Sequence, residues 1–564
     1  MRFTSFCRLC LALTFVWAFG FNVVKANDIF IHTAPAMIRT APGLGANEVF
    51  IEFGVRWENS WRVFHPQTGL TKWDAAWVFV KWAPMTSVRK GPWRHVYVDT
   101  NRNNHQILAS SDPARLDVGT TNGRGMGVFV YRTDIGTGPF SVDTMRLRWN
   151  YSGLGITDLD SIDFRIFGVE MVYVPEGPFM MGDGAPRAAS FSVNATYPAL
   201  WNPTTGANTN NLIDGPYLGP YDGTQRNNRR IDESTTYRGT SIPAAFPRGL
   251  KAIYVMKHPI TQRAYVDFLN TLETGQQAAR TWISPFTSVQ PTAPLAVGPN
   301  AVSGVNSAAT YRNFIRLRRA AQIVGLGDTI PALYGHSRQP GVTNWRFAEN
   351  GGYIACNFLN IWDGLAYADW AGLRPMTEME FEKICRGPGE PILGALAWGQ
   401  RGSSNVAQGV DHEFTGLEQF FSGNFQPLFG ELSPDGRRYY VVRVGSFAHA
   451  NSGRYEAGAA YYGALHMSDN VWERVISLDG GLGFTGEHGD GVLTASGEAN
   501  TPNWPTLPLS TNPIKFGSRG YEISNRTWVN PVAPNYLGAP EYLGARTTGA
   551  TYANYGFRAV RTAP

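Results

Sequence analysis

The segment Leu373–Gly387, LRPMTEMEFEKICRG, gathers three glutamates, two arginines, a lysine and Cys385 within one short stretch. A cysteine in such a charged setting could be a nucleophile or a metal ligand, since both roles need the thiolate form. A neighbouring histidine often stabilises a catalytic thiolate, and no histidine stands near Cys385 in the sequence. A structural role for the segment is therefore the competing interpretation.

The spacing of the same residues predicts a well-capped helix. Thr377 and Glu380 have the S/T-x-x-E spacing of a capping box, in which the threonine oxygen accepts a backbone N–H and the glutamate reaches back to the cap. Acidic residues in the first turns and basic residues in the last turn match the helix dipole. Phe381 and Cys385 are four residues apart, so both can face the core. We expect a structural helix.

Cysteine usage allows at most one disulfide in the mature chain. Of the four cysteines, Cys7 and Cys10 lie in an N-terminal segment that has the pattern of a secretory signal. In an oxidising compartment the remaining two, Cys356 and Cys385, would most simply form a disulfide. Two separate buried thiols are the alternative. A metal-binding or catalytic pair has little support, because no histidine is near either residue.

Residues 1–26 have the pattern of a signal peptide, which would leave Asn27 as the first mature residue. A basic start precedes an apolar run, Leu9–Val24, that is short for a membrane span, and Ala26 offers the cleavage position. We expect an exported protein, in the periplasm, at the cell surface or outside the cell. An uncleaved signal anchor is the alternative.

Charge and hydropathy limit the expected partners. Removing the signal lowers the formal charge from +5 to +2, and the sequence contains no basic block. Nucleic acid is therefore not an expected partner. No later apolar run approaches membrane-spanning length, so we expect no transmembrane segment after signal removal.

Residues 27–167 have the pattern of an all-β sandwich domain. Turn residues separate six β-branched or aromatic runs: Glu48–Trp57, Ala75–Trp82, His95–Asp99, Gly127–Arg132, Met145–Trp149 and Ile162–Phe167. Several of these runs alternate apolar with polar residues, and no helical periodicity lies between them.

The tryptophans of this part allow a second interpretation. They include Trp73, Trp77, Trp82 and Trp93. Exposed aromatic rings would suit a carbohydrate-binding surface. Trp77 and the apolar run after it fit a buried strand better, so we expect core positions for most of them.

Residues 168–564 combine two further helical patterns with long irregular stretches. Thr261–Leu272 and Asn360–Gly372 repeat apolar residues at helical spacing, and the final glycine is placed to end the second helix. The irregular stretches cover about residues 183–250, 280–345 and 479–512. Such loops need packing on a rigid core, or bound ions, to hold them.

Several segments, taken in order, resemble the formylglycine-generating enzyme family, also called sulfatase-modifying factors. They are Val169–Gly184 (VEMVYVPEGPFMMGDG), Ala252–Asn270 (AIYVMKHPITQRAYVDFLN), Ile361–Gly387 (IWDGLAYADWAGLRPMTEMEFEKICRG), Ala397–Gly399 (AWG), Val444–Phe447 (VGSF), Tyr462–Val475 (YGALHMSDNVWERV) and Gly556–Arg561 (GFRAVR). The resemblance implies an α+β, C-type-lectin-like fold that is loop-rich, with a small twisted sheet and two helices. Here the β-sandwich domain would precede it.

The family's oxidase activity uses a copper-binding cysteine pair near the C-terminus. No cysteine follows Cys385, and around the expected position the sequence reads FGSRGYEISNRTWVN, Phe516–Asn530. Cu(I) selects thiolate ligands, which serine and threonine cannot replace. Copper is therefore not an expected cofactor, and no catalytic residues are assigned.

An enzyme with altered chemistry in the same cleft is the alternative. Its polar residues would include Arg519, Glu522, Asn525 and Arg546. Arg519 and Arg546 would serve equally well as structural salt-bridge partners.

Calcium is the ion that the resemblance implies. A first site would use the Glu473 carboxylate with backbone oxygens of Asp469 and Val471. His466 stands where the family has a side-chain oxygen, and histidine is a poor calcium ligand because hard cations prefer oxygen. A buried hydrogen bond is the alternative role for Glu473.

A second implied calcium site lies in the segments SGNF and SPDG. It would use the side chains of Asn424 and Asp435, with the carbonyl oxygens of Phe425 and Arg437. Ions at these two sites would crosslink long loops that lack a disulfide network.

Three functions stay open. The favoured one is an exported pseudoenzyme of the sulfatase-modifying-factor type, a binding or structural scaffold for a protein or glycan in a cell-surface or extracellular assembly. A family enzyme with altered chemistry, acting in protein maturation or oxidation, is the second. A carbohydrate-binding protein is the third. The sequence does not set the oligomeric state.

Overall fold

The structure is a computed structural model of the chain. It describes residues 29–66, 68–86, 90–186, 213–214, 226–231, 233–234, 236–237, 240–281, 283–288, 312–325, 328–336, 351–389, 396–399, 410–411, 419–420, 441–448, 452–476, 481–505, 516–520 and 555–564.

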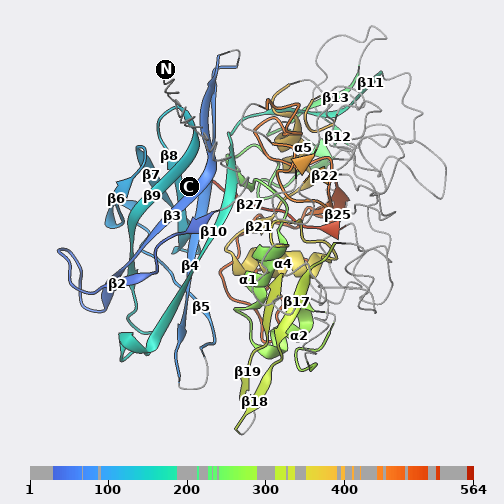
Figure 1. The fold of residues 1–564 in the computed structure, drawn as a ribbon. Coiled ribbons are helices and arrows are strands. Elements are labelled where there is room, and N and C mark those ends of the chain that lie inside the picture. Colours follow the sequence, from blue (N-terminus) through green and yellow to red (C-terminus); the bar gives the residue numbers. More distant parts are fainter. Residues whose placement is uncertain are drawn as a thin grey trace, which may run out of the picture.

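A 13-stranded antiparallel sheet dominates the described chain (Figure 1). Its main path runs through β21 (Arg374–Pro375), β27 (Ala559–Thr562), β16 (Ile253–Met256), β10 (Ile162–Val174), β4 (Leu70–Pro84), β3 (Glu48–His65), β9 (Gly136–Asn150) and β6 (Gln106–Ser110). The strands off this path are β1 (Phe30–Ile31), β2 (Ala36–Ile38), β5 (Arg94–His95), β7 (Ala114–Thr121) and β8 (Arg124–Arg132).

Smaller sheets and helices surround this sheet. The small sheets contain β11 (Phe179–Pro186) with β13 (Arg226–Ile231); β12 (Ile213–Asp214), β14 (Thr236–Tyr237) and β15 (Thr240–Ser241); β17 (Ile315–Arg319) with β20 (Leu333–His336); β18 (Gln322–Val324) with β19 (Asp328–Ile330); β22 (Val410–Asp411) with β23 (Gln419–Phe420); and β25 (Phe516–Arg519), β24 (Trp472–Ile476) and β26 (Tyr555–Gly556). The described α-helices are α1 (Gln262–Leu269), α2 (Thr274–Arg280), α4 (Ile361–Trp370) and α5 (Glu378–Arg386).

Helices α1, α4 and α5 each begin at a capping side chain, and the cap of α5 is the one that the sequence predicts. The side chains of Thr261 and Asn360 accept backbone N–H groups at the starts of α1 and α4. In α5 the Glu380 N–H donates to Thr377 Oγ1 (3.2 Å), and the Thr377 N–H donates to Glu380 Oε2 (3.0 Å). The predicted capping box is confirmed. Helix α2 lacks an apolar stripe and was not predictable from periodicity.

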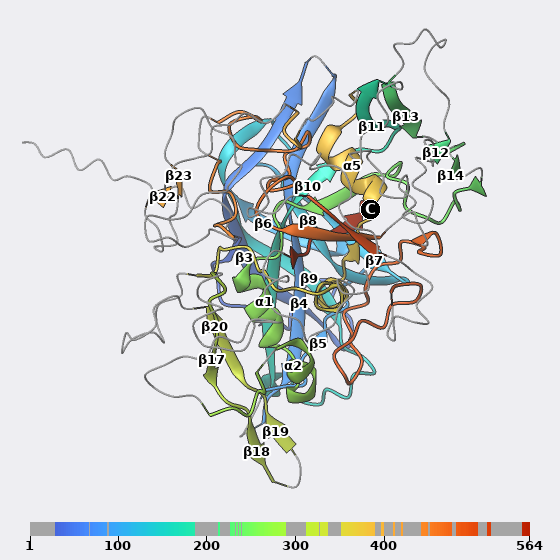
Figure 2. The ribbon, with the colours of Figure 1, turned by 90° about the vertical axis from the view of Figure 1, so that its right-hand side faces the viewer.

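Strand β4 is buried on both faces, and this fixes the order of three layers. Val78 and Val80 belong to a core that β3 and β9 close on the far side. The alternate residues, Trp77 and Phe79, belong to a second core shared with α1 and α4. Because successive side chains of a strand point to opposite faces, the β4–β8–β10 layer lies between the β3–β9 layer and the helices. Figure 2 shows α1, α2 and α5 in front of the sheet.

The α+β, loop-rich, C-type-lectin-like fold implied by the family resemblance is wrong. The described chain is mostly β, and its largest unit is the 13-stranded antiparallel sheet. The physical reason lies in β10, which pairs with β4 over residues 162–172 and with β16 over residues 171–174. The boundary placed between residues 167 and 168 falls inside this strand. Strands on both sides of it therefore share one sheet.

Most of the predicted strand positions in residues 27–167 agree with the structure, unlike the predicted fold class. Of the six predicted runs in residues 27–167, all but His95–Asp99 lie wholly within a strand. The exception contributes only its first residue to β5. Strand propensity and alternation therefore located the elements, although they did not show how the sheet continues beyond residue 167.

Side chains hold the irregular stretch predicted at 479–512, of which residues 481–505 are described. The carboxylate of Asp369 in α4 accepts the backbone N–H groups of Asp490 (3.0 Å) and Asn500 (2.9 Å). Lys81 of β4 donates to the carbonyl oxygen of Gly491 (2.9 Å). These buried side chains tie the loop to both the helical layer and the sheet.

Arg561 and Trp77 join the sheet to the helical layer. The Arg561 guanidinium lies 4.8 Å from the Trp77 ring centroid. It donates to the carbonyl oxygens of Thr120 and Gly372. Trp77 Nε1 donates to the carbonyl oxygen of Ala371, just after α4 (2.8 Å). These contacts hold the side chains of Arg561 and Trp77 in place between the sheet and the helical layer.

Substitution of Gly119 tests this junction. A Cβ at Gly119 would lie 2.5 Å from Arg561 Nε and 2.8 Å from the Trp77 ring, and neither side chain is free to move aside. We expect Gly119→Ala to lower the free energy of unfolding by about 1–3 kcal/mol, the usual range for overpacking, as measured by urea denaturation. Gly275→Ala in α2, where the nearest atom lies 4.0 Å away, is the control and should not destabilise. Equal stability of both variants would contradict the close junction.

Candidate functional site

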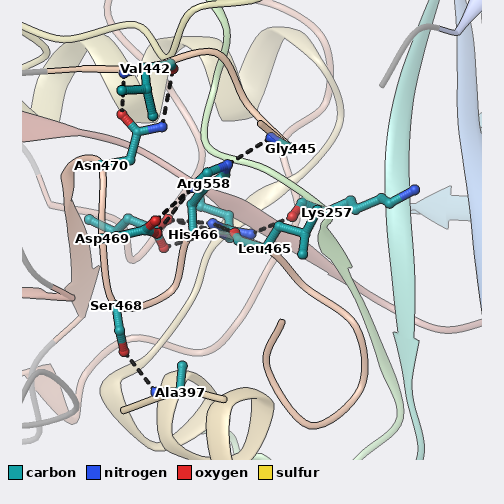
Figure 3. A network of polar contacts seen from close by, with 11 residues as sticks. Lys257, Ala397, Val442, Gly445, Leu465, His466, Ser468, Asp469, Asn470 and Arg558 are labelled. Atoms are coloured by element: carbon teal, nitrogen blue, oxygen red, sulfur yellow. Dashed lines mark hydrogen bonds and ion pairs between the residues drawn. The ribbon is translucent and has the colours of Figure 1, made fainter. Parts of the chain in front are cut away.

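The carboxylate assigned to the first calcium site is engaged by an arginine. Arg558 Nε lies 2.8 Å and 3.0 Å from the two carboxylate oxygens of Glu473, and Nη2 lies 2.6 Å from one of them. The Nη groups of Arg558 also donate to the carbonyl oxygens of Met256, Lys257 and Leu465. Figure 3 shows Arg558 reaching Leu465 and Lys257 in this network. Both members of the ion pair are fully buried.

Of the other two residues of that predicted site, Asp469 also has protein partners. The carbonyl oxygen of Asp469 accepts the N–H of Val471 (2.9 Å). The Asp469 carboxylate lies 3.0 Å from His466 Nδ1, and His466 Nε2 accepts the Gly445 N–H (2.7 Å), as Figure 3 shows. Since Nε2 must be the acceptor, the proton of the neutral ring is on Nδ1 and points at Asp469.

The structure therefore favours the alternative role for Glu473, that of a buried hydrogen-bonded carboxylate. In the part of the chain that the structure describes, no cluster of three or more His, Cys, Asp or Glu side chains could hold a metal ion. The second predicted calcium set, Asn424, Phe425, Asp435 and Arg437, lies outside the described residues.

The disulfide expected between Cys356 and Cys385 is not formed. Both are free, buried thiols. Cys356 packs in the core that contains α1 and α4, whereas Cys385 packs in a separate core around α5. Burial raises the pKa of each thiol well above its usual value. Both are therefore protonated and poorly reactive.

The acidic residues of α5 find a buried partner far along the chain. Arg519 donates to Glu382 (2.7 Å) and Glu378 (3.2 Å). All three side chains are buried, which matches the structural salt-bridge role foreseen for Arg519. The other residues of the altered-chemistry hypothesis, Glu522, Asn525 and Arg546, lie outside the described residues.

The four tryptophans considered for carbohydrate binding are packed against protein groups. Trp77 and Trp82 are buried in the two cores. Trp73 stacks on Tyr173 with ring centroids 3.8 Å apart. The Arg165 guanidinium lies 4.4 Å from the centroid of Trp93. The core assignment of Trp77 and Trp82 is confirmed, and the half-buried Trp73 and Trp93 also have protein partners.

A cavity of about 620 Å³ lies at one edge of β10, and we call it the β10-edge cavity. Residues 164–170 of β10 form one wall, residues of α1 form another, and the N-terminal residues 29–35 form a third. Strand β10 pairs with β4 along residues 162–172 but with β16 only from residue 171. Among the described strands, none pairs with the remaining edge, and the cavity occupies this position.

Helix α1 presents polar residues to the cavity. Arg263, Asp267 and Asn270 follow one another at spacings of four and three residues, so they lie on one side of the helix. Tyr265 and Phe268 pack into the core on the other side. The helix thus uses one face for packing and the other for the cavity.

Asp267 is a carboxylate without a protein partner among the described residues. No hydrogen bond or ion pair from that part of the chain reaches it. Its partial burial raises its pKa to about 6, although the charges of Arg263 and Arg165 oppose the shift. Both arginines are also lining residues of the cavity, so residues of opposite charge border the same space without an ion pair to Asp267.

His258 is a second polar group that the protein leaves unpaired. It lines the cavity and is only 6% exposed, yet neither ring nitrogen has a hydrogen-bond partner among the described residues. Burial lowers the pKa of His258 well below its usual value, and the charge of Lys257 adds to the effect. The neutral ring can offer one N–H donor and one acceptor to a ligand.

Sequence reasoning missed both Asp267 and His258. The helical pattern of residues 261–272 leaves Asp267 on the polar face, where a solvated position is the default expectation. Only the approach of β10, about one hundred residues earlier in the chain, makes that face the wall of a cavity. His258 carries no motif that would single it out.

Comparison of the chain with protein-family profiles and with curated proteins finds no match. Within the described part of the chain, no helix is both long enough and apolar enough to cross a membrane.

Removing the Arg558 guanidinium tests the buried pair. We expect Arg558→Met to lower the free energy of unfolding by about 3–5 kcal/mol, because Glu473 would keep a buried charge without a partner. The control is Arg39→Met, which removes a pair with Asp160 whose side chains are 42% and 78% exposed. It should change stability by less than about 1 kcal/mol. Urea denaturation measures both, and a similar small loss in both variants would contradict the structural role of Arg558.

The raised pKa of Asp267 predicts a pH-dependent stability effect. The folded protein holds this proton more tightly than the unfolded chain, so stability falls as pH rises from about 4 to about 6 and stays lower above that range. We expect Asp267→Asn to stabilise the protein above pH 6 by about 1–2 kcal/mol, and to have no effect near pH 4. The exposed Asp134→Asn is the control. A stabilisation of Asp267→Asn that is equal at pH 4 and pH 7 would contradict the assignment.

Proposed function

We propose that this chain is an exported, non-catalytic binding protein, a scaffold in a cell-surface or extracellular assembly, whose ligand site is the β10-edge cavity. The observation that carries the proposal is Asp267, a carboxylate that faces the cavity without a protein partner among the described residues. A half-buried charge of this kind lowers the stability of the unliganded protein. Side chains that lower the stability of the folded protein are typical of functional sites.

The cavity has the composition of a small-molecule site. Its volume of about 620 Å³ lies within the range of about 300–1,000 Å³ that is usual for such sites. Aromatic side chains, including Phe167 and Trp370, line one part of it, and polar or charged residues line the rest. Apolar surface for packing combined with polar groups that fix orientation is the usual design of a binding pocket.

The non-catalytic part of the proposal is supported by where the reactive groups lie. The thiols of Cys356 and Cys385 are buried and protonated, away from the cavity lining. The Glu473 carboxylate is held by Arg558. These three candidates for covalent or metal chemistry are thus committed to the core.

A relationship to the sulfatase-modifying factors remains part of the proposal. The segments that carry the resemblance adjoin one another in space: β10 pairs with β16, β16 with β27, and β27 with β21. Neighbouring segments of the same set form α1, α4 and α5. This common assembly supports a shared origin of the segments without requiring the family's activity.

A ligand screen with a cavity-filling variant tests the proposal. Ala264 lines the cavity from α1, so Ala264→Trp should fill part of it. We expect one class among amino acids, sugars and organic acids to raise the melting temperature of the wild type, since a ligand that binds only the folded state stabilises it. The same class should leave Ala264→Trp unchanged.

The matched control is Ala278→Trp, at an exposed position of α2, which should respond as the wild type does. The absence of any stabilising class, or equal shifts in all three proteins, would contradict the cavity as the binding site. Stoichiometric copper or iron in the purified protein would contradict the non-catalytic assignment.

A further inference from the structure

We infer that the β10-edge cavity binds a free α-amino acid with an apolar side chain, in its zwitterionic form. The inference rests on the proposed binding function and specifies the ligand. It is carried by the arrangement of Asp267, Arg165 and Arg263 around one space that also has an apolar wall.

Because the cavity lining includes both a carboxylate and guanidiniums, it suits a ligand that carries a positive and a negative charge. Arg165 lies on β10 and Arg263 on α1, and both act electrostatically on Asp267. Neither guanidinium comes within ion-pair distance, 4.0 Å, of the Asp267 carboxylate, although all three side chains line the same cavity. A ligand with an ammonium and a carboxylate on one carbon can meet Asp267 with the first and a guanidinium with the second.

Contacts within the protein hold the two guanidiniums in place. Arg165 Nη1 donates to the carbonyl oxygen of Asn270 (2.9 Å), and its guanidinium lies over Trp93. Arg263 Nη1 donates to the hydroxyl of Tyr353 (3.3 Å). A guanidinium has five N–H donors, so the hydrogen bond to Asn270 orients Arg165 and leaves donors for a carboxylate.

Two further features fit an amino acid. His258, neutral and unpaired, can donate a hydrogen bond to the ligand carboxylate or accept one from the ammonium. The part of the β10 edge that no described strand pairs with can add backbone N–H and C=O groups, which peptide ligands commonly use. Phe167, Val169 and Trp370 supply an apolar wall for the ligand's side chain.

Other ligand classes fit less well. A neutral sugar would displace water from the guanidiniums and from Asp267 without offering them charged partners, which is unfavourable in a partly buried site. A simple carboxylate would leave Asp267 unpaired and be repelled by it. A divalent cation would be repelled by the guanidiniums of Arg165 and Arg263. Besides Asp267, the lining holds one more carboxylate, that of Glu170, which is already paired with Lys257 (2.8 Å).

Three related probes separate these possibilities in calorimetric titrations at pH 7.5. L-phenylalanine carries both charges, 3-phenylpropionate lacks the ammonium, and phenylalaninamide lacks the carboxylate. We expect L-phenylalanine to bind the wild type at least tenfold more tightly than either analogue. Similar affinity for all three would overturn the inference, because it would show that the ring alone is recognised.

Substitutions test which side chain of the protein recognises each charged group of the ligand. We expect Asp267→Asn to weaken L-phenylalanine binding at least tenfold and not to weaken 3-phenylpropionate binding. Arg165→Gln should weaken both carboxylate ligands and spare phenylalaninamide. Ala264→Trp should abolish binding of all three, whereas Ala278→Trp should change none. Circular dichroism and the melting temperature of each variant show that it is folded.

The outcomes distinguish this inference from the proposed function. If L-phenylalanine does not bind but another compound binds in a way that Ala264→Trp abolishes, the binding function stands and the amino-acid assignment is wrong. If no compound depends on the cavity, both are wrong. Tight L-phenylalanine binding that persists in Asp267→Asn would also overturn the zwitterion assignment.

Discussion

The fold depends on one strand layer, β4–β8–β10, that is covered on both faces. Alternate residues of β4 enter different cores, so neither face can be polar and neither covering layer can be removed without exposing apolar surface. The β3–β9 layer and the helices are therefore fixed relative to one another through the strand between them. The position of the β10-edge cavity follows from the same layer, since it lies where β10 loses its second neighbour.

Buried polar side chains connect the loops to this frame. Asp369 and Lys81 bind the backbone of the stretch 481–505, Arg558 binds three carbonyl oxygens, and Arg519 joins a distant strand to α5. Buried ion pairs add little net stability compared with apolar packing, but breaking one is costly. Their effect here is to fix which backbone segments meet. The need for crosslinks was foreseeable from the loop lengths, and buried arginine, lysine and aspartate side chains supply several of them where the structure describes the chain.

Local features were predictable from the sequence, and long-range ones were not. The capping box of Thr377 and Glu380 depends on residues three apart, so its sequence signature is sufficient. Gly168 illustrates the opposite case. A glycine in mid-strand suggests a break, but here its missing Cβ makes room for Ile29, whose side chain would lie 2.3 Å from it. The strand continues through the boundary placed between residues 167 and 168, and no spacing within the sequence indicates this.

Within the described part of the chain Asp267 has no partner, because the two nearby arginines make other contacts. Arg263 is one helical turn away, at a spacing that often gives an ion pair, but it contacts Tyr353 and Phe30 instead. Arg165 approaches from β10, but it contacts Asn270 and Trp93. These contacts use part of each guanidinium and none of them involves Asp267. The same helix that fills the core with one face thus keeps, with its other face, opposite charges apart in a space that a ligand can bridge.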